Sequence, residues 1–255
     1  MNTEAEKEQA LESFRKEGYV ALRGFLNEQE VVELVGNVQR FLREIVPTMP
    51  PHHVFYENKD DKSTLKQLQQ MFGYDPYFRK MMFGSEFEKW AEHLLQTPVV
   101  GKNLQYFNKP PGVGQPTPAH QDGFYMKLEP CEAVTMWLAL EDVDEENGCV
   151  RYVPGSHRRG MRLHQRTQTL GFSQGISDYG QPEDVKGEIP VPAKAGDLLI
   201  HHAMTIHRAD GNRSKTRTRQ ALGFIFYSAL AREDEQTIEA YQKTLHRDLA
   251  AAGKI

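Results

Sequence analysis

Apolar residues recur with helical spacing in the first hundred residues. Asn27 and Glu30 form a capping-box pattern that predicts the start of a helix. A single apolar stripe then follows, made of Val31, Leu34, Val35, Val38, Phe41, Leu42 and Ile45. A second helix is expected from Pro76, with Phe78, Met81 and Met82 inward. A third is expected after Ser85 and Glu88, with Trp90, Leu94 and Leu95 inward. The segment 18–25 reads as an early strand.

After Pro98 the pattern changes to short β-type runs separated by turn signals such as PPGVG, ENG and DGN. These runs cover 99–108, 132–143, 149–153, 188–193, 197–202 and 219–229. They predict a sandwich or jelly roll with helices packed outside. The stretch 155–187 has little periodicity and is a candidate substrate cover. A closing helix is expected over about 233–249, and without a composition break one domain is expected over 1–255.

Composition narrows the class of protein. The chain has 255 residues, 39% hydrophobic and 26% charged, as globular proteins do. Its net charge of −4 gives no field favouring nucleic acid, and its longest apolar runs are too short to span a membrane. The acidic N-terminus does not resemble a signal peptide, so a cytoplasmic location is expected. Cys131 and Cys149, the only cysteines, are expected to be free thiols.

His120 and Asp122 flank one glutamine in AHQDGFYMKLE. One interpretation is a polar turn in which Asp122 caps a backbone amide. The other is a pair of ligands on one strand face, since side chains at i and i+2 point the same way. An oxygenase-type iron(II) site needs two histidines and one carboxylate.

The third ligand has several candidates, namely His157, His164, His201, His202 and His207. His201 and His202 alternate on a strand, so at most one can point inward. The stretch GDLLIHHAMTIHRADGN favours His207, at the start of the next strand. Arg217 and Arg219 follow, and an arginine here could pair with the distal carboxylate of a metal-bound cosubstrate.

Three ordered motifs carry a family resemblance: AHQDGF, NGCVRYVPGSH, and GDLLIHH…HRADGNRS…RQALGF. From about Gly18 to Tyr227 the chain resembles the phytanoyl-CoA dioxygenase family of Fe(II)- and 2-oxoglutarate-dependent oxygenases. The resemblance implies a mainly β fold with flanking α-helices, a double-stranded β-helix (jelly roll, cupin-like). It also implies a metal triad of His120, Asp122 and His207. Arg219 would bind the 2-oxoglutarate C5 carboxylate, and Trp137, Gln105 and Lys66 would line the cosubstrate pocket.

The chain departs from the family pattern at two positions. Ala209 stands where serine is usual, and the arginine lies one residue later than usual, which leaves Arg217 as an alternative to Arg219. Asp122 argues against halogenation, because halogenating relatives replace this carboxylate with a small residue.

The reaction implied is hydroxylation of an unactivated C–H bond in a small-molecule metabolite, with 2-oxoglutarate converted to succinate and CO2. The cofactors would be Fe(II), 2-oxoglutarate and O2, with ascorbate as a stimulant. Candidate substrate-binding residues are His164, Phe124, Tyr125 and Lys127. Alternative substrates are a fatty acyl-CoA or a small polar or anionic compound such as an aminoalkylphosphonate. Alternative roles are another oxidative outcome, a zinc-binding cupin, and a catalytically idle regulatory domain; monomer and homodimer both stay open.

Overall fold

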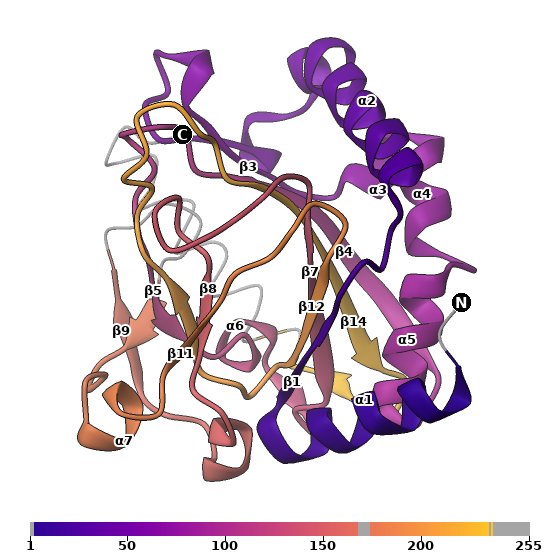
Figure 1. Cartoon of the computed structure of the whole chain (residues 1–255), viewed down its shortest axis with the longest axis vertical. Coiled ribbons are helices and arrows are strands. Elements are labelled where there is room, and N and C mark those ends of the chain that lie inside the picture. The colour runs from indigo at the N-terminus through magenta and orange to yellow at the C-terminus, as the bar shows by residue number, and fades with distance from the viewer. Residues whose placement is uncertain (1–2, 168–173, 235, 237–255) are drawn as a thin grey trace.

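Two antiparallel sheets pack against each other, and helices cover the outer face of the larger one (Figure 1). The computed structural model describes residues 3–167, 174–234 and 236. Its helices are α1 (Glu4–Glu17), α2 (Glu28–Glu44), α3 (Met71–Tyr74), α4 (Pro76–Met82), α5 (Glu86–Leu95), α6 (Gly123–Met126) and α7 (Pro182–Val185). Short 3-10 turns are η1 (Val46–Thr48), η2 (Pro51–His53), η3 (Lys62–Thr64) and η4 (Ser156–Arg159).

Strands make up the rest of the regular structure. Within the described residues the larger sheet has the order β1-β12-β7-β14-β4-β3-β2, and the smaller has the order β11-β8-β13-β5. Two further pairs are β10-β9 and β15-β6. Their bounds are β1 (Tyr19–Leu22), β2 (Val54–Tyr56), β3 (Leu65–Leu68), β4 (Val99–Asn108), β5 (Thr117–His120), β6 (Leu128–Glu129), β7 (Ala133–Ala139), β8 (Val150–Tyr152), β9 (His164–Arg166), β10 (Gln174–Ile176), β11 (Ile189–Val191), β12 (Leu198–His202), β13 (His207–Ala209), β14 (Gln220–Ser228) and β15 (Arg232–Glu233).

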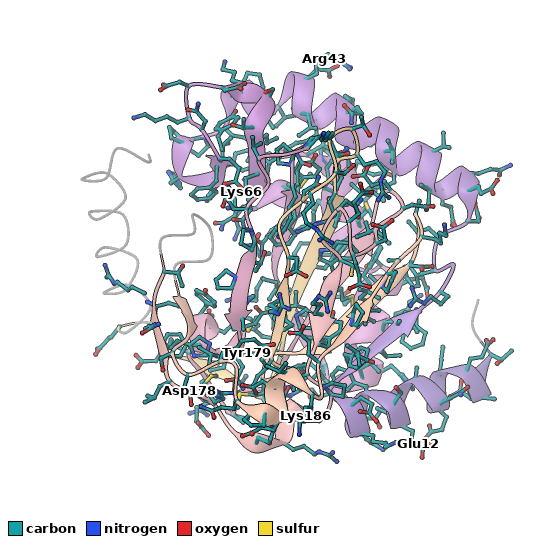
Figure 2. All side chains as sticks on the ribbon, turned by 60° about the vertical axis from the view of Figure 1, so that its left-hand side comes forward. Glu12, Arg43, Lys66, Asp178, Tyr179 and Lys186 are labelled. Carbon is teal, nitrogen blue, oxygen red and sulfur yellow. The ribbon has the colours of Figure 1, made fainter. Side chains whose placement is uncertain are left out.

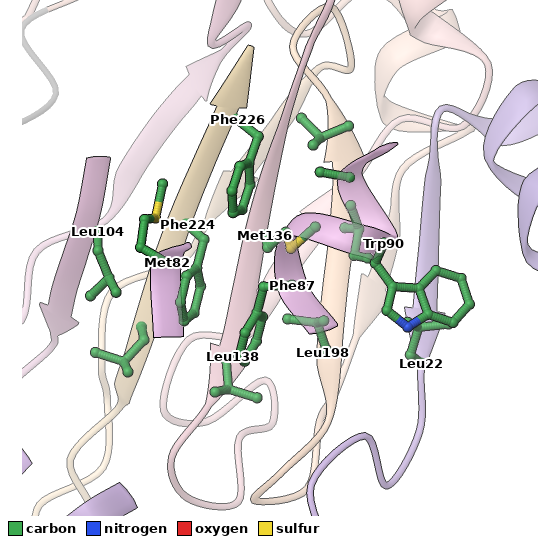
Figure 3. Close-up of a cluster of buried hydrophobic side chains, with 14 of the residues drawn as sticks. Leu22, Met82, Phe87, Trp90, Leu104, Met136, Leu138, Leu198, Phe224 and Phe226 are labelled. Atoms are coloured by element: carbon green, nitrogen blue, oxygen red, sulfur yellow. The ribbon is translucent and has the colours of Figure 1, made fainter. Parts of the chain in front are cut away.

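The helices form where the local sequence favours them. Asn27 and Glu30 make the predicted reciprocal capping box at the start of α2, and Ser85 caps α5 through the Glu88 amide. These helices and α1 and α4 bury their apolar faces against the outer face of the larger sheet (Figure 1). Phe87 of α5 stacks on Phe224 of β14 at 4.1 Å, within a cluster of buried side chains (Figure 3).

The inner face of the larger sheet packs on the smaller sheet. Every residue of β7 is buried, because the helices cover one side of this strand and the smaller sheet covers the other. Trp137, Leu199 and Ala221 of the larger sheet belong to the same buried cluster as Val150 and Tyr152 of the smaller one. Thr135 and Trp137 lie two residues apart on β7, so both side chains face inward between the two sheets. His201, the register partner of Thr135 on β12, faces inward as well.

The predicted fold class, a mainly β jelly roll with flanking helices, is confirmed. The predicted strand 99–108 coincides with β4, whereas 155–187 contains β9, β10 and α7 rather than irregular chain alone. Glu233 ends the short strand β15, and almost all of the closing helix predicted from there lies outside the described residues. In the described part of the chain, no helix combines the length and apolar character needed to cross a membrane.

Candidate metal and cosubstrate site

His120 and His207 face each other across two paired strands of the smaller sheet. His120 is the last residue of β5, His207 is the first of β13, and the two are direct register partners. Their ring centroids lie 4.2 Å apart, and both side chains are buried. The pairing of β5 with β13 therefore brings together two imidazoles that are 87 positions apart in sequence order.

Backbone carbonyls fix the orientation of both imidazoles. Nδ1 of His120 lies 2.8 Å from the Pro118 carbonyl oxygen, and Nδ1 of His207 lies 3.0 Å from the Thr205 carbonyl oxygen. Because a carbonyl oxygen only accepts, each Nδ1 carries a proton, and Nε2 is the ring nitrogen left to face a metal. A histidine metal ligand has this arrangement, with its outer nitrogen bound to a carbonyl or carboxylate. Burial and the neighbouring His201 and His120 imidazoles lower the pKa of His207 well below its usual range, which favours the neutral ring.

Asp122, the third expected ligand, lies in a helical turn and not on a strand. The prediction that His120 and Asp122 share a strand face is wrong, because β5 ends at His120 and Asp122 has φ −59° and ψ −35°, at the start of α6. The chain turns there because the amides of Phe124 and Met126 bond to the Gln121 and Asp122 carbonyls.

The turn still brings the carboxylate to the imidazoles. Oδ1 of Asp122 lies 3.3 Å from Nε2 of His120 and 3.7 Å from Nε2 of His207. One ligand atom from each of the three residues lies within 4.8 Å of the others. The donor set of two imidazole nitrogens and one carboxylate oxygen fits a facial iron(II) site.

The other carboxylate oxygen of Asp122 is held by the larger sheet. Oδ2 accepts hydrogen bonds from Thr135 Oγ1 at 2.6 Å and from His201 Nε2 at 3.1 Å. Burial by itself raises the pKa of Asp122, but the neighbouring His207 and the hydrogen bond from His201 outweigh it and hold this pKa well below its usual range. Asp122 is therefore ionised, with one oxygen left for a metal.

Gln121, between the two ligands, is fully buried and joins three segments. Its amide nitrogen donates to the carbonyls of Gly160 and Met204, and its oxygen accepts from the Arg162 amide. The chain on either side of Gln121 is thereby fixed relative to the loop before β13.

Arg219 is a buried cation just before β14. It does not lie on the predicted strand, and its guanidinium carbon is 5.6 Å from the Trp137 ring centroid. Burial lowers its pKa to about 10, partly offset by Glu141, so the group stays charged at neutral pH. Among the described residues it forms no ion pair within 4.0 Å, and its buried Nε has no hydrogen-bond partner. A buried, unpaired guanidinium suits the carboxylate of a dicarboxylic cosubstrate.

Arg217, the alternative, has a different environment. It is not on a regular strand face with Arg219, and its guanidinium pairs at the surface with Asp144 at 2.8 Å and with Glu146 at 2.5 Å. Its charge is therefore already balanced by acidic side chains.

Other expected cosubstrate residues lie near the end of β4 and on β3. Lys66 is buried and pairs with Glu57 at 3.1 Å, and Gln105 accepts a hydrogen bond from Gln67 at 2.6 Å. Lys66 lies toward the opposite end of the molecule from Asp178, Tyr179 and Lys186 (Figure 2). Lys109, which sequence analysis did not single out, is also buried, and its ammonium donates to the Asp210 carbonyl at 2.6 Å. Burial, with Arg219 and Lys66 nearby, lowers the pKa of Lys109 well below its usual range.

The expected substrate residues form a stacked group beside the metal ligands. The His164 ring stacks on Phe124 at 4.2 Å, and the Lys127 ammonium lies 3.7 Å from the centroid of the Phe124 ring. Nε2 of His164 accepts a hydrogen bond from the Gln121 amide, so that nitrogen is not free for a metal. The Tyr125 hydroxyl is hydrogen-bonded to the backbone of Gln174 in β10 and anchors that strand.

Sequence analysis missed the residues that hold Asp122. His201 and His202 do point to opposite sides of β12, but the inward one, His201, contacts the carboxylate ligand. Tyr152, fully buried, contacts Nδ1 of His201 at 3.0 Å. Strand alternation could have identified Thr135 and His201 as inward-facing, but not what they touch.

The chain is similar to known proteins in sequence and in fold. Residues 14–221 match the family model "Phytanoyl-CoA dioxygenase (PhyH)". "Phytanoyl-CoA dioxygenase 1" of Oryza sativa subsp. japonica is 32% identical over 173 residues, which cover 63% of this chain and 60% of that protein. The chain thus spans somewhat less than two thirds of the length of this relative.

Solved structures agree with the fold. The epimerase SnoN, in complex with Fe3+, alpha ketoglutarate and nogalamycin RO, has a TM-score of 0.70 at 25% identity, covering 91% of this chain and 87% of its own. The carbocyclase SnoK from nogalamycin biosynthesis has a TM-score of 0.71 at 27% identity, covering 89% and 85%. With a histidine–aspartate–histidine triad and a family match over most of its length, the chain belongs to the phytanoyl-CoA dioxygenase family of Fe(II)- and 2-oxoglutarate-dependent oxygenases.

Proposed function

We propose that this chain oxidises an unactivated C–H bond of a small-molecule metabolite and converts 2-oxoglutarate to succinate and CO2. The observation that carries the proposal is that His120, Asp122 and His207 each place one ligand atom within 4.8 Å of the others. These three residues would hold iron(II). When bound, iron with 2-oxoglutarate and O2 supplies the oxidising power.

Arg219 has the properties needed to bind the cosubstrate. Its buried guanidinium would form parallel charge-assisted hydrogen bonds to the C5 carboxylate, and Trp137 would support one side of the bound molecule. Among the described residues Arg219 forms no direct ion pair, so the cosubstrate carboxylate would be its first, and this interaction would select a dicarboxylate and fix its direction. Gln105 on β4 and Lys66 on β3 are proposed to line this pocket. Their side chains are held in place by a hydrogen bond from Gln67 and an ion pair with Glu57, respectively.

Phe124, Tyr125, His164 and Lys127 are proposed to border the substrate. The stacked Phe124 and His164 rings offer an apolar wall two residues beyond Asp122, and the Lys127 ammonium beside that wall offers a positive charge. Such a surface suits a small substrate with an apolar body and an anionic group. A fatty acyl-CoA is less favoured, because Arg162 is already bound to Asp178 and Asp184 and is not free for a CoA phosphate.

The solved structures of SnoN and SnoK support a second possible reaction. SnoN is described as an epimerase and SnoK as a carbocyclase, so the same family architecture serves reactions other than hydroxylation. Ring closure or epimerisation of the substrate is therefore the alternative proposal for this chain.

A product-resolved turnover assay tests the proposal. Protein purified without oxygen and loaded with Fe(II) would be incubated with 2-oxoglutarate, O2, ascorbate and a panel of small anionic metabolites, with Asp122→Ala as the matched control. Succinate release above the control, stimulated by one substrate, is the expected result. The mass of the product distinguishes added oxygen from ring closure or epimerisation. Succinate release equal to that of Asp122→Ala for the iron-loaded protein, with or without substrates, would contradict the proposal.

A further inference from the structure

The two carboxylate oxygens of Asp122 contact different sheets. Oδ1 faces the imidazoles of the smaller sheet, and Oδ2 accepts from Thr135 and His201 of the larger sheet. Thr135 and His201 are direct register partners across β7 and β12, so their side chains leave the sheet side by side. The two donors therefore approach the same oxygen from neighbouring strands.

A buried hydrogen-bond chain fixes the direction of the His201 contact. Ionised Asp122 only accepts, so His201 donates to it from Nε2. The other ring nitrogen, Nδ1, is hydrogen-bonded to the Tyr152 hydroxyl at 3.0 Å, which fixes the orientation of the ring. Tyr152 is held in turn by stacking on Tyr19, with ring centroids 4.5 Å apart. Tyr152, His201 and Asp122 thus form one chain of two hydrogen bonds, which runs from the smaller sheet through His201 of the larger sheet to the carboxylate.

We propose that Thr135 and His201, the latter oriented by Tyr152, are positioning residues that restrict Asp122 to binding the metal through Oδ1 alone. A carboxylate that bound through both oxygens would occupy a further coordination position and would have to give up at least one of the two hydrogen bonds to Oδ2. The three positions opposite the triad stay open for the cosubstrate and O2 only if Asp122 is monodentate. This inference rests on the proposed function, since it concerns the same metal site.

Pairs of substitutions separate the hydrogen bond from simple packing. In His201→Gln the side-chain amide reaches the position of Nε2 and can still donate to Asp122. In His201→Asn the amide reaches only the position of Nδ1, and the donor to Oδ2 is lost. Thr135→Ser keeps the hydroxyl donor, whereas Thr135→Val removes it with little change in shape. Each disruptive variant therefore has a conservative partner at the same position.

The direct readout is the number of water molecules on a bound metal. Manganese(II) would be added to the metal-free proteins, and its water ligands would be counted by electron–nuclear double resonance in oxygen-17 water. The wild type, His201→Gln and Thr135→Ser are expected to hold three waters, as a triad with three open positions requires. His201→Asn combined with Thr135→Val is expected to hold fewer, because Oδ2 is then free to bind.

A second readout is cosubstrate affinity for the manganese(II) protein, which does not turn over. The combined variant is expected to bind 2-oxoglutarate about tenfold more weakly, in the range found when outer residues of metal sites are removed. Tyr152→Phe should also weaken 2-oxoglutarate binding, by a smaller factor. Thermal unfolding of the metal-free proteins shows whether each variant folds, and if His201→Asn does not, Thr135→Val against Thr135→Ser decides by the same water count.

The outcomes separate this inference from the proposed function. If the wild type holds manganese(II) with three waters and the disruptive variants do the same with unchanged 2-oxoglutarate affinity, the positioning role is overturned while the metal site stands. If the wild type binds neither manganese(II) nor iron(II), the proposed function fails and this inference fails with it.

Discussion

Oδ1 of Asp122 lies 3.3 Å from Nε2 of His120, although one residue belongs to a helical turn and the other ends a strand. That proximity depends on the sharp turn at Gln121, whose buried side chain is bound to three separate segments. The candidate metal site is thus built from one strand pair, which supplies both histidines, and one turn, which supplies the carboxylate.

Removal of the carboxylate should abolish turnover. In Asp122→Ala the metal would lose an anionic ligand, so substrate-dependent succinate release should fall by at least about 100-fold. Loss of a residue that only supports a metal ligand already lowers activity by about 10- to 100-fold. The measurement is succinate release with Fe(II) and 2-oxoglutarate in excess. Asp144→Ala, which removes a surface carboxylate paired with Arg217, is the control and should keep near wild-type turnover. Full turnover by Asp122→Ala would refute the triad assignment.

The two arginines near the start of β14 should behave differently. Arg219→Ala removes the buried guanidinium, and the KM for 2-oxoglutarate should rise about 10- to 100-fold, as expected for loss of a hydrogen bond between charged groups worth about 1.5–3 kcal/mol. Arg217→Ala breaks only a surface ion pair, so the KM should change by less than about threefold. Steady-state kinetics at varied 2-oxoglutarate concentration measure both. A larger effect at Arg217 would reverse the assignment.

The close packing behind the metal site predicts a paired stability effect. A Cβ at Gly123 would lie 2.3 Å from Sγ of Cys131 and 3.0 Å from Cε of Met161. Gly123→Ala should therefore lower the free energy of unfolding by about 1–3 kcal/mol through overpacking. The double variant Gly123→Ala, Cys131→Ala should recover much of that loss, because the sulfur that meets the new methyl group is gone. Denaturant unfolding of the single and double variants tests this, and no recovery in the double variant would show that Cys131 is not the obstacle.

The sequence predictions that the structure confirms depend on local patterns. The capping box at Asn27 and Glu30 and the β-type run of β4 are contained within short segments, so their boundaries could be predicted from spacing alone. The backbone at Asp122 could not, because its helical turn depends on contacts with segments far along the chain. The partner of His201 is 79 residues away, and only the packing of the sheets makes that contact. Strand alternation indicated which way His201 points, whereas the identity of its partner required the three-dimensional arrangement.

Acid should weaken the fold through His202. Nδ1 of this side chain accepts a hydrogen bond from the Met204 amide, so protonation at Nδ1 would break that bond. Burial, with His157 and His201 nearby, lowers the pKa of His202 to about 4 from 6.5 in the unfolded chain. Because the folded-state pKa is the lower one, the unfolded chain takes up the proton first as the pH falls. The stabilisation is therefore complete above pH 6.5 and is lost progressively down to about pH 4.

The expected loss from this one group is about 3 kcal/mol of unfolding free energy, at about 1.4 kcal/mol for each pH unit between the two pKa values. His202→Asn offers a matched variant, since the asparagine oxygen can accept from the Met204 amide and does not titrate. Denaturant unfolding at a series of pH values from 7 to 4 should give a shallower decline for His202→Asn than for the wild type. Parallel curves would show that another group carries the acid sensitivity, whereas convergence of the two toward pH 4 would assign it to the bond between Met204 and His202.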